Sequence, residues 1–192
     1  MTTSSDRLTK FLAHLDAIFQ IEPSFYPFES TVPGAPKLLA LVYRDVPEPA
    51  HVTGVTFGLS EVPHADWEFG RPELIISLQS TDIAWPLAVG ELANQLRGQC
   101  PFCYGNVINF GEKISDESDM SAFFIFAPSI LERADFLNID VGGPQPVNIA
   151  GMYPIYDSER AMFASLGLES FWHHPNFDLY DVKRPKVNSA VC

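Results

Sequence analysis

Near the N-terminus, apolar side chains recur at intervals of three and four residues, the period of a helix with one buried face. The stripe consists of Leu8, Phe11, Leu12, Leu15, Ile18 and Phe19. Ser4 or Ser5 can cap the helix and Pro23 ends it. The pattern predicts a helix over residues 5–20 that packs on a sheet. The alternative is a helix whose stripe docks on a partner.

Two more segments have helical character. Residues 84–96 carry an apolar stripe made of Trp85, Ala88, Val89, Leu92, Ala93 and Leu96. Pro86 fits the first turn of this helix, where its missing N–H does no harm, and Gly98 ends it. A third helix begins at Asp157 or Ser158 and ends at Gly167, with one more turn possible over 168–173.

Short apolar runs bounded by turn residues predict the strands. Residues 52–59 and 73–78 flank a turn-rich loop, and the second run is apolar on both faces, as in a strand at the centre of a sheet. The turn residues 142–144 separate two of the remaining runs. We expect further strands over residues 37–42, 106–110, 122–127, 136–141 and 147–155.

These elements predict one α+β domain, a mixed and largely antiparallel sheet packed with helices. Residues 1–36 form the first helix and an irregular proline-rich connection, packed on the same domain. Residues 37–174 form the domain itself. Residues 175–192 form a C-terminal tail without helical period, partly disordered or draped over the surface.

The net charge is −12, from 24 acidic and 12 basic residues. A surface this negative repels phosphate backbones, which disfavours direct nucleic-acid binding and suits a basic partner. The N-terminus lacks the apolar stretch of a signal peptide, and no apolar run approaches the roughly 18 residues of a membrane span. Three cysteines do not form a disulfide framework, so we expect a cytoplasmic protein.

An ordered set of short strings resembles the suppressor of fused domain family, in its single-domain bacterial type. The strings are YRDV at 43–46, VTFGLS at 55–60, ELIISL at 73–78, WPL at 85–87, GNVI at 105–108, FFIFAP at 123–128 and PIY at 154–156. The resemblance runs from about residue 37 to residue 172. One departure is Asn106, which stands where the family usually has an acidic residue.

This resemblance implies a suppressor-of-fused-like fold and a protein without established catalytic residues. The animal member is a two-domain binder of transcription factors whose peptide sits between the domains, and this chain is too short for the second domain. Single-domain bacterial members are proposed to be immunity proteins that neutralise toxins. The resemblance therefore implies protein binding, without cofactor or metal.

Cys100 and Cys103 have the spacing of a redox pair. Such a pair needs its first thiol at a helix N-terminus, whereas this one follows a helix end and precedes a strand. A zinc site with His173 and His174 lacks the usual gap between its histidines. We therefore expect a turn with partly buried cysteines rather than a redox or metal site.

A catalytic triad could be drawn around Ser60. Its partners would be His51 or His64, together with Asp66, but Gly58-Leu59-Ser60 lacks the glycine pattern of a nucleophile elbow. An enzyme or small-molecule binder with a site near Cys100 and Cys103, or near His64, remains the alternative to protein binding. A regulatory scaffold is a further alternative.

Two acidic loops are the candidate partner-binding surface. The first holds Trp67 among Glu61, Asp66 and Glu68, an aromatic among acids that is typical of an interface hot spot against a basic partner. The second holds Glu112, Asp116, Glu117 and Asp119. In each loop the plainer interpretation is local packing or a solvated turn. Together, on one face, they would cover the cationic cleft of a toxin domain.

Overall fold

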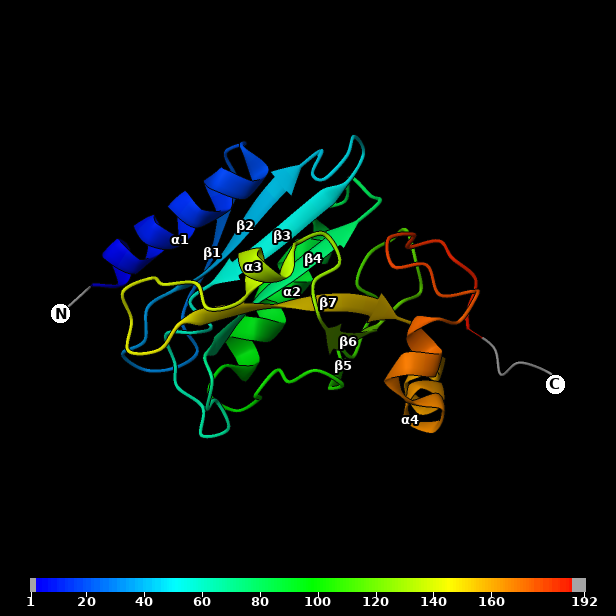
Figure 1. Cartoon of the computed structure of the whole chain (residues 1–192). Coiled ribbons are helices and arrows are strands. Elements are labelled where there is room, and N and C mark those ends of the chain that lie inside the picture. The colour runs from blue at the N-terminus through cyan, green and yellow to red at the C-terminus, as the bar shows by residue number, and fades with distance from the viewer. Residues whose placement is uncertain (1–2, 188–192) are drawn as a thin grey trace.

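The computed structural model describes residues 3–187, which form one mixed sheet with helices on both faces (Figure 1). Within this range the sheet has seven strands in the order β1-β2-β3-β4-β7-β6-β5. In spatial order their bounds are Ser24–Phe28, Leu38–Arg44, Val52–Phe57, Arg71–Leu78, Val147–Ile155, Ala122–Phe126 and Val107–Asn109. Only β4 and β7 are parallel; the other neighbours are antiparallel. The predicted α+β fold class is confirmed.

Helices cover the two faces of the sheet because alternate strand residues point to opposite sides. The helix α1, Ser4–Phe19, buries Phe11 and Leu15 on one face, together with Leu41 of β2 and Ile75 of β4. The helix α2, Ala84–Leu96, covers the other face, as Figure 1 shows. It lies directly on β3 because Gly54 has no side chain; a Cβ there would be 2.2 Å from Cβ of Pro86.

A third apolar cluster joins the sheet to the C-terminal part of the chain. The helix α4, Asp157–Trp172, is broken at Gly167, the residue that the sequence marks as a helix end. Its Phe163 and Phe171 pack on Phe124 of β6. Residues 175–187 are irregular, yet Phe177 and Val187 are buried in the same cluster, and residues 188–192 lie outside the described range.

Two segments differ from their expected structure. Residues 21–36 contain the strand β1 where an irregular connection was expected; β1 is an edge strand, so Pro27 removes no donor that the sheet needs. Residues 136–141 do not form the expected strand. A short helix α3, Arg133–Phe136, ends there, Asn138 has φ 59°, and a single bridge joins Ile139 to Val147.

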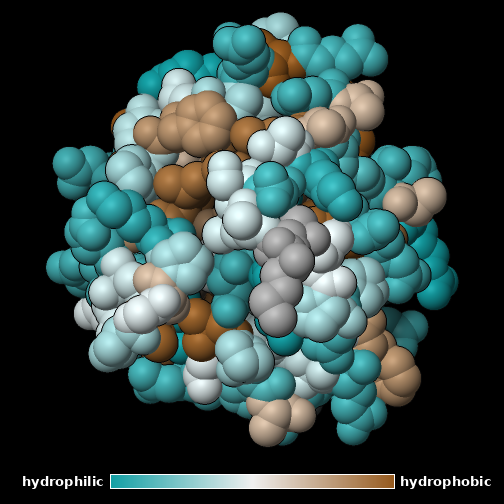
Figure 2. Space-filling model, turned by 90° about the vertical axis from the view of Figure 1, so that its left-hand side faces the viewer, coloured by the Kyte–Doolittle hydropathy of each residue, from teal (hydrophilic) through white to brown (hydrophobic). Residues whose placement is uncertain are grey.

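No helix among residues 3–187 combines the length and the apolar character that a membrane crossing requires. Figure 2 shows the end of the molecule where α1 begins: hydrophilic and pale side chains cover most of it, and brown ones form separate small areas. The apolar side chains visible at this end therefore form no broad surface.

Candidate protein-binding groove

A groove of about 410 Å³ lies where the loop between β3 and β4 faces the segment before β5 and the start of β7. Its apolar lining includes Trp67, Phe69, Pro101, Phe102, Tyr104 and Leu137. Asp66 and Glu68 also line it, and both side chains are exposed. An open apolar groove with acidic side chains at its rim suits a partner's protruding side chains better than a small polar substrate.

Trp67 and Phe69 have different positions in this groove. Trp67 is only 8% exposed, and its indole Nε1 donates to the Pro101 carbonyl at 2.8 Å. The sequence allows two interpretations of Trp67, an interface hot spot or local packing, and in the structure the ring packs into the groove wall. Phe69 is 85% exposed and is the side chain that projects. The sequence reasoning passed over it, although an aromatic beside Gly70 in a polar loop was the available signal.

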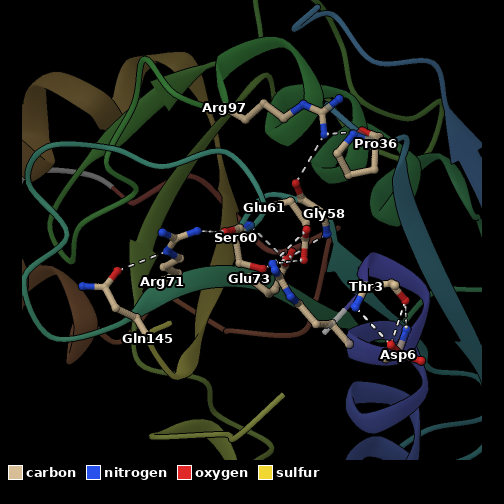
Figure 3. A network of polar contacts seen from close by, with 11 residues as sticks. Thr3, Asp6, Pro36, Gly58, Ser60, Glu61, Arg71, Glu73, Arg97 and Gln145 are labelled. Carbon is tan, nitrogen blue, oxygen red and sulfur yellow. Dashed lines mark hydrogen bonds and ion pairs between the residues drawn. The ribbon is translucent and has the colours of Figure 1, made fainter. Parts of the chain in front are cut away.

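A chain of hydrogen bonds fixes the groove wall to the sheet, and Figure 3 shows its part from Gln145 through Arg71 and Ser60 to Glu73. Gln145 Nε2 donates to the Trp67 carbonyl at 3.3 Å, and Gln145 Oε1 accepts from Arg71 Nε at 3.1 Å. Arg71 Nη1 in turn donates to the Ser60 carbonyl at 3.0 Å. The loop thus has a defined shape despite its lack of helix or strand, so the groove is preformed.

This series of hydrogen bonds ends at Glu73, a residue of β4 whose carboxyl group has 0% exposure. Its Oε2 accepts from Thr56 Oγ1 at 2.6 Å, and its Oε1 accepts from Ser60 Oγ at 2.6 Å. Oε1 also accepts from the backbone N–H groups of Gly58 at 2.8 Å and Ser60 at 3.0 Å. Burial raises the pKa of Glu73, and these four hydrogen bonds oppose that rise.

Arg97 contacts the turn formed by residues 58–60 from the side opposite Glu73. It is 1% exposed, and its Nη1 donates to the carbonyls of Pro36 at 2.9 Å and Gly58 at 3.3 Å. Burial lowers the pKa of Arg97, while the nearby Glu73 opposes that change. Gly58 has φ 117°, and a Cβ there would lie 2.9 Å from the Lys37 carbonyl oxygen, so this turn requires glycine.

Ser60 and the histidines do not form a catalytic arrangement. The Ser60 hydroxyl donates to Glu73, whereas His64 Nδ1 accepts from the Asp66 backbone N–H at 3.1 Å. His51 lies beside Tyr180, with ring centroids 6.1 Å apart. The triad that could be drawn in the sequence is therefore not assembled.

The cysteine turn contributes one of its two thiols to the groove. Cys103 is exposed at the groove, and Cys100 is half-buried; both thiols are free. Burial raises the pKa of Cys100, the opposite of what a nucleophilic thiol needs. Across residues 3–187, no group of three or more His, Cys, Asp or Glu side chains is placed to hold a metal ion.

The acidic residues of the first loop fall into two sets. Glu61 pairs with Arg7 of α1 at 3.0 Å, and its side chain is only 9% exposed. It therefore helps to attach α1 to the loop, and it is not among the residues that line the groove. Asp66 and Glu68 remain at the groove, which Phe69 also lines.

The second acidic loop lies at the other end of β4. Glu117 accepts hydrogen bonds from Ser80 Oγ and, at 3.2 Å, from Trp85 Nε1, just beyond the last residue of β4. The groove loop ends at the first residue of β4, eight residues and therefore roughly 25 Å away. Glu112, Asp116 and Asp119 are exposed in this second loop, and Asp119 lies 3.6 Å from Lys113. The two loops thus form separate surfaces.

Several solved structures share this fold. One is a homologue of the suppressor of fused protein from Neisseria gonorrhoeae FA 1090, 18% identical with a TM-score of 0.72; the match covers 96% of this chain and 98% of that one. Another is the Sufu–Fu complex, 14% identical with a TM-score of 0.65, matched over 94% of this chain and 91% of that one.

Drosophila Suppressor of Fused is 14% identical with a TM-score of 0.57, and the match covers 81% of this chain but 43% of that one. No curated protein matches the chain. The model of the suppressor of fused protein family matches residues 34–185, most of the sequence. The chain therefore belongs to the suppressor of fused family.

Proposed function

We propose that this protein is a non-catalytic binding module whose groove holds a basic protein partner. We further propose that the partner is a toxin domain, which the module neutralises by stoichiometric binding. The observation that carries the proposal is the exposed Phe69 on a preformed groove whose charged lining residues, Asp66 and Glu68, are both acidic. The similar fold in the Sufu–Fu complex supports binding of protein as the mode of action.

Each part of the groove has a role in this mechanism. Asp66 and Glu68, in a molecule of net charge −12, attract a basic partner and accelerate encounter. Phe69 then loses its exposed surface in the complex, which makes it the anchor. Trp67 and its hydrogen-bonded supports keep the groove open beforehand, so little ordering is needed on binding. A toxin whose active site is covered this way cannot reach its substrate.

Charge reversal tests the surface. We expect Asp66→Lys combined with Glu68→Lys to lower affinity for the toxin domain at least about tenfold, because like charges then face each other. The matched control, Asp116→Lys with Asp119→Lys, makes the same charge change at the other end of β4 and should leave affinity within about twofold. Calorimetric titration with a catalytically inactive toxin domain measures both.

Growth provides the biological readout. Co-expression of the wild-type protein with the active toxin domain should restore growth, and the Asp66→Lys, Glu68→Lys variant should restore it poorly. A loss of affinity confined to the control variant would move the surface to the second acidic loop. Unchanged affinity in both variants would exclude the acidic residues and leave binding itself open. A regulatory scaffold is indicated instead if the partner is bound but growth never depends on the complex.

A further inference from the structure

A second apolar cleft lies next to the groove, on the last part of α4. It has a volume of about 300 Å³ and is lined by Phe126, Leu168, Glu169, Trp172 and His173. The break at Gly167 separates this part of α4 from the preceding helix. The cleft therefore lies on the short helical segment after Gly167, which is positioned by the packing of Phe171 and Trp172 on the sheet.

Trp172 gives this cleft a firm wall. Its ring lies 5.0 Å from the ring of Tyr153 and 6.2 Å from that of Phe177, measured between centroids. Both of these residues belong to the buried cluster under α4. A half-buried aromatic ring held on its inner side and open on its outer side has the form of a binding pocket wall.

Aromatic contacts connect the cleft to the groove. Tyr104, which lines the groove and is 46% exposed, has its ring centroid 5.5 Å from that of Phe126. Phe126 lines the cleft, and its ring lies 4.9 Å from that of Trp172. The wall of one cavity is thus in contact with the wall of the other, and we call the three residues Tyr104, Phe126 and Trp172 the aromatic track.

The charged groups that line both cavities are carboxylates, and Arg133 is a cation close enough to Tyr104 to oppose the rise that burial causes in the pKa of that tyrosine. The lining of the two cavities contains the carboxylates of Asp66, Glu68 and Glu169 and no lysine or arginine. Within residues 3–187, neither Glu68 nor Glu169 has an ion pair, and Asp66 has only His64 at 3.9 Å. These carboxylates complement a cationic occupant and repel an acidic one.

We propose that the two cavities together hold one extended, basic segment of the partner protein, with an apolar side chain in each cavity. Tyr104 and Trp172 are no more than roughly 10 Å apart along the aromatic track, which corresponds to at most about three residues of extended chain. Because alternate side chains of an extended chain face the same side, the two anchors of the segment are two positions apart, with lysine or arginine close by. This inference rests on the proposed function of the groove.

Synthetic peptides test the two-anchor requirement. The probe is a fluorescein-labelled twelve-residue peptide with two tryptophans two positions apart among lysines and glycines. Three relatives serve as comparisons: one tryptophan replaced by alanine, the tryptophans moved to adjacent positions, and all lysines replaced by glutamate. Fluorescence anisotropy should show the two-anchor peptide binding at least tenfold tighter than each relative. Equal affinity of the one-anchor and two-anchor peptides, or no measurable binding of either, overturns the inference.

Variants of the cleft separate this inference from the proposed function. Glu169→Lys and Leu168→Ser should each weaken the two-anchor peptide at least fivefold and leave the one-anchor peptide unchanged. Asp66→Lys with Glu68→Lys should weaken both peptides. Glu22→Lys, an exposed charge reversal just after α1, is the matched control and should change neither. If Glu169→Lys and Leu168→Ser have no effect while Asp66→Lys with Glu68→Lys weakens binding, the cleft is excluded and the groove stands.

Discussion

Replacing Glu73 by alanine should lower the free energy of unfolding by about 4 kcal/mol, because the change strands buried donors that nothing else can satisfy. Glu73 accepts from Thr56 and Ser60 hydroxyls and from the N–H groups of Gly58 and Ser60, all in the interior. Water cannot replace the carboxylate without opening the turn. Urea denaturation followed by circular dichroism measures the loss.

Glu68→Ala is the control, since Glu68 is exposed and should change stability by less than about 0.5 kcal/mol. The Glu73→Ala variant should also weaken partner binding beyond what its unfolded fraction explains. Ser60 lies between Glu73 and Arg71, and Arg71 reaches Trp67 through Gln145, so loss of the turn loosens the groove wall. A stable Glu73→Ala variant would mean that the turn is held from the Arg97 side alone.

The pH dependence of Glu73 has a definite sign. Burial raises its pKa above the ordinary 4.5, so over the range just above 4.5 the folded protein keeps a proton that the unfolded chain has released. The contribution of Glu73 to stability is therefore greatest below pH 4.5 and falls as pH rises through the folded-state pKa. The stability difference between wild type and Glu73→Gln should shrink accordingly. A difference that grows with pH would show that the four donors, and not burial, dominate.

Much of the fold follows from periodicity. The stripe of residues 5–20 and the alternating strands could be predicted because a buried face repeats every turn or every second residue. The strand β1 could not, because Pro27 lowers strand propensity and only the position at the sheet edge makes it harmless. The predicted strand at 136–141 is wrong although its apolar residues pack in the core, because the positive φ of Asn138 interrupts any strand there.

The sequence also predicts only part of the candidate site. Asp66, Trp67 and Glu68 could be found because an aromatic among acids is a local signal, and the structure places all three at one groove. The separation of the two acidic loops depends on strand order and on which end of β4 each loop adjoins, and no local pattern contains this. The sequence pattern places Glu73 only within a buried strand, and a lone carboxyl in such a strand indicates that it needs hydrogen-bond partners.

Arg184→Ala should lower the free energy of unfolding by about 4 kcal/mol, because it leaves a buried carboxylate without its cation. Glu159 and Arg184 are 0% and 2% exposed, and Arg184 Nη1 and Nη2 each donate to one carboxylate oxygen of Glu159 at 2.7 Å. The Val187 N–H also donates to Glu159 Oε1 at 2.7 Å. The guanidinium lies over the ring of Phe177 at 4.8 Å, so charge and apolar packing hold residues 175–187 together.

Arg160→Ala is the matched control, because Arg160 pairs with Asp157 on the same helix at 2.9 Å but is 41% exposed, and its loss should cost no more than about 0.5 kcal/mol. The double variant Glu159→Gln with Arg184→Met removes both charges and should be more stable than Arg184→Ala, since no buried charge is left unpaired. Guanidinium denaturation ranks the three. Limited proteolysis after residue 172 should accelerate in Arg184→Ala alone. If Arg184→Ala lowers the free energy of unfolding no more than Arg160→Ala does, residues 175–187 are a tail attached by apolar contacts. A loss of about 4 kcal/mol would instead make these residues an integral part of the domain and of the aromatic cluster that supports the cleft of α4.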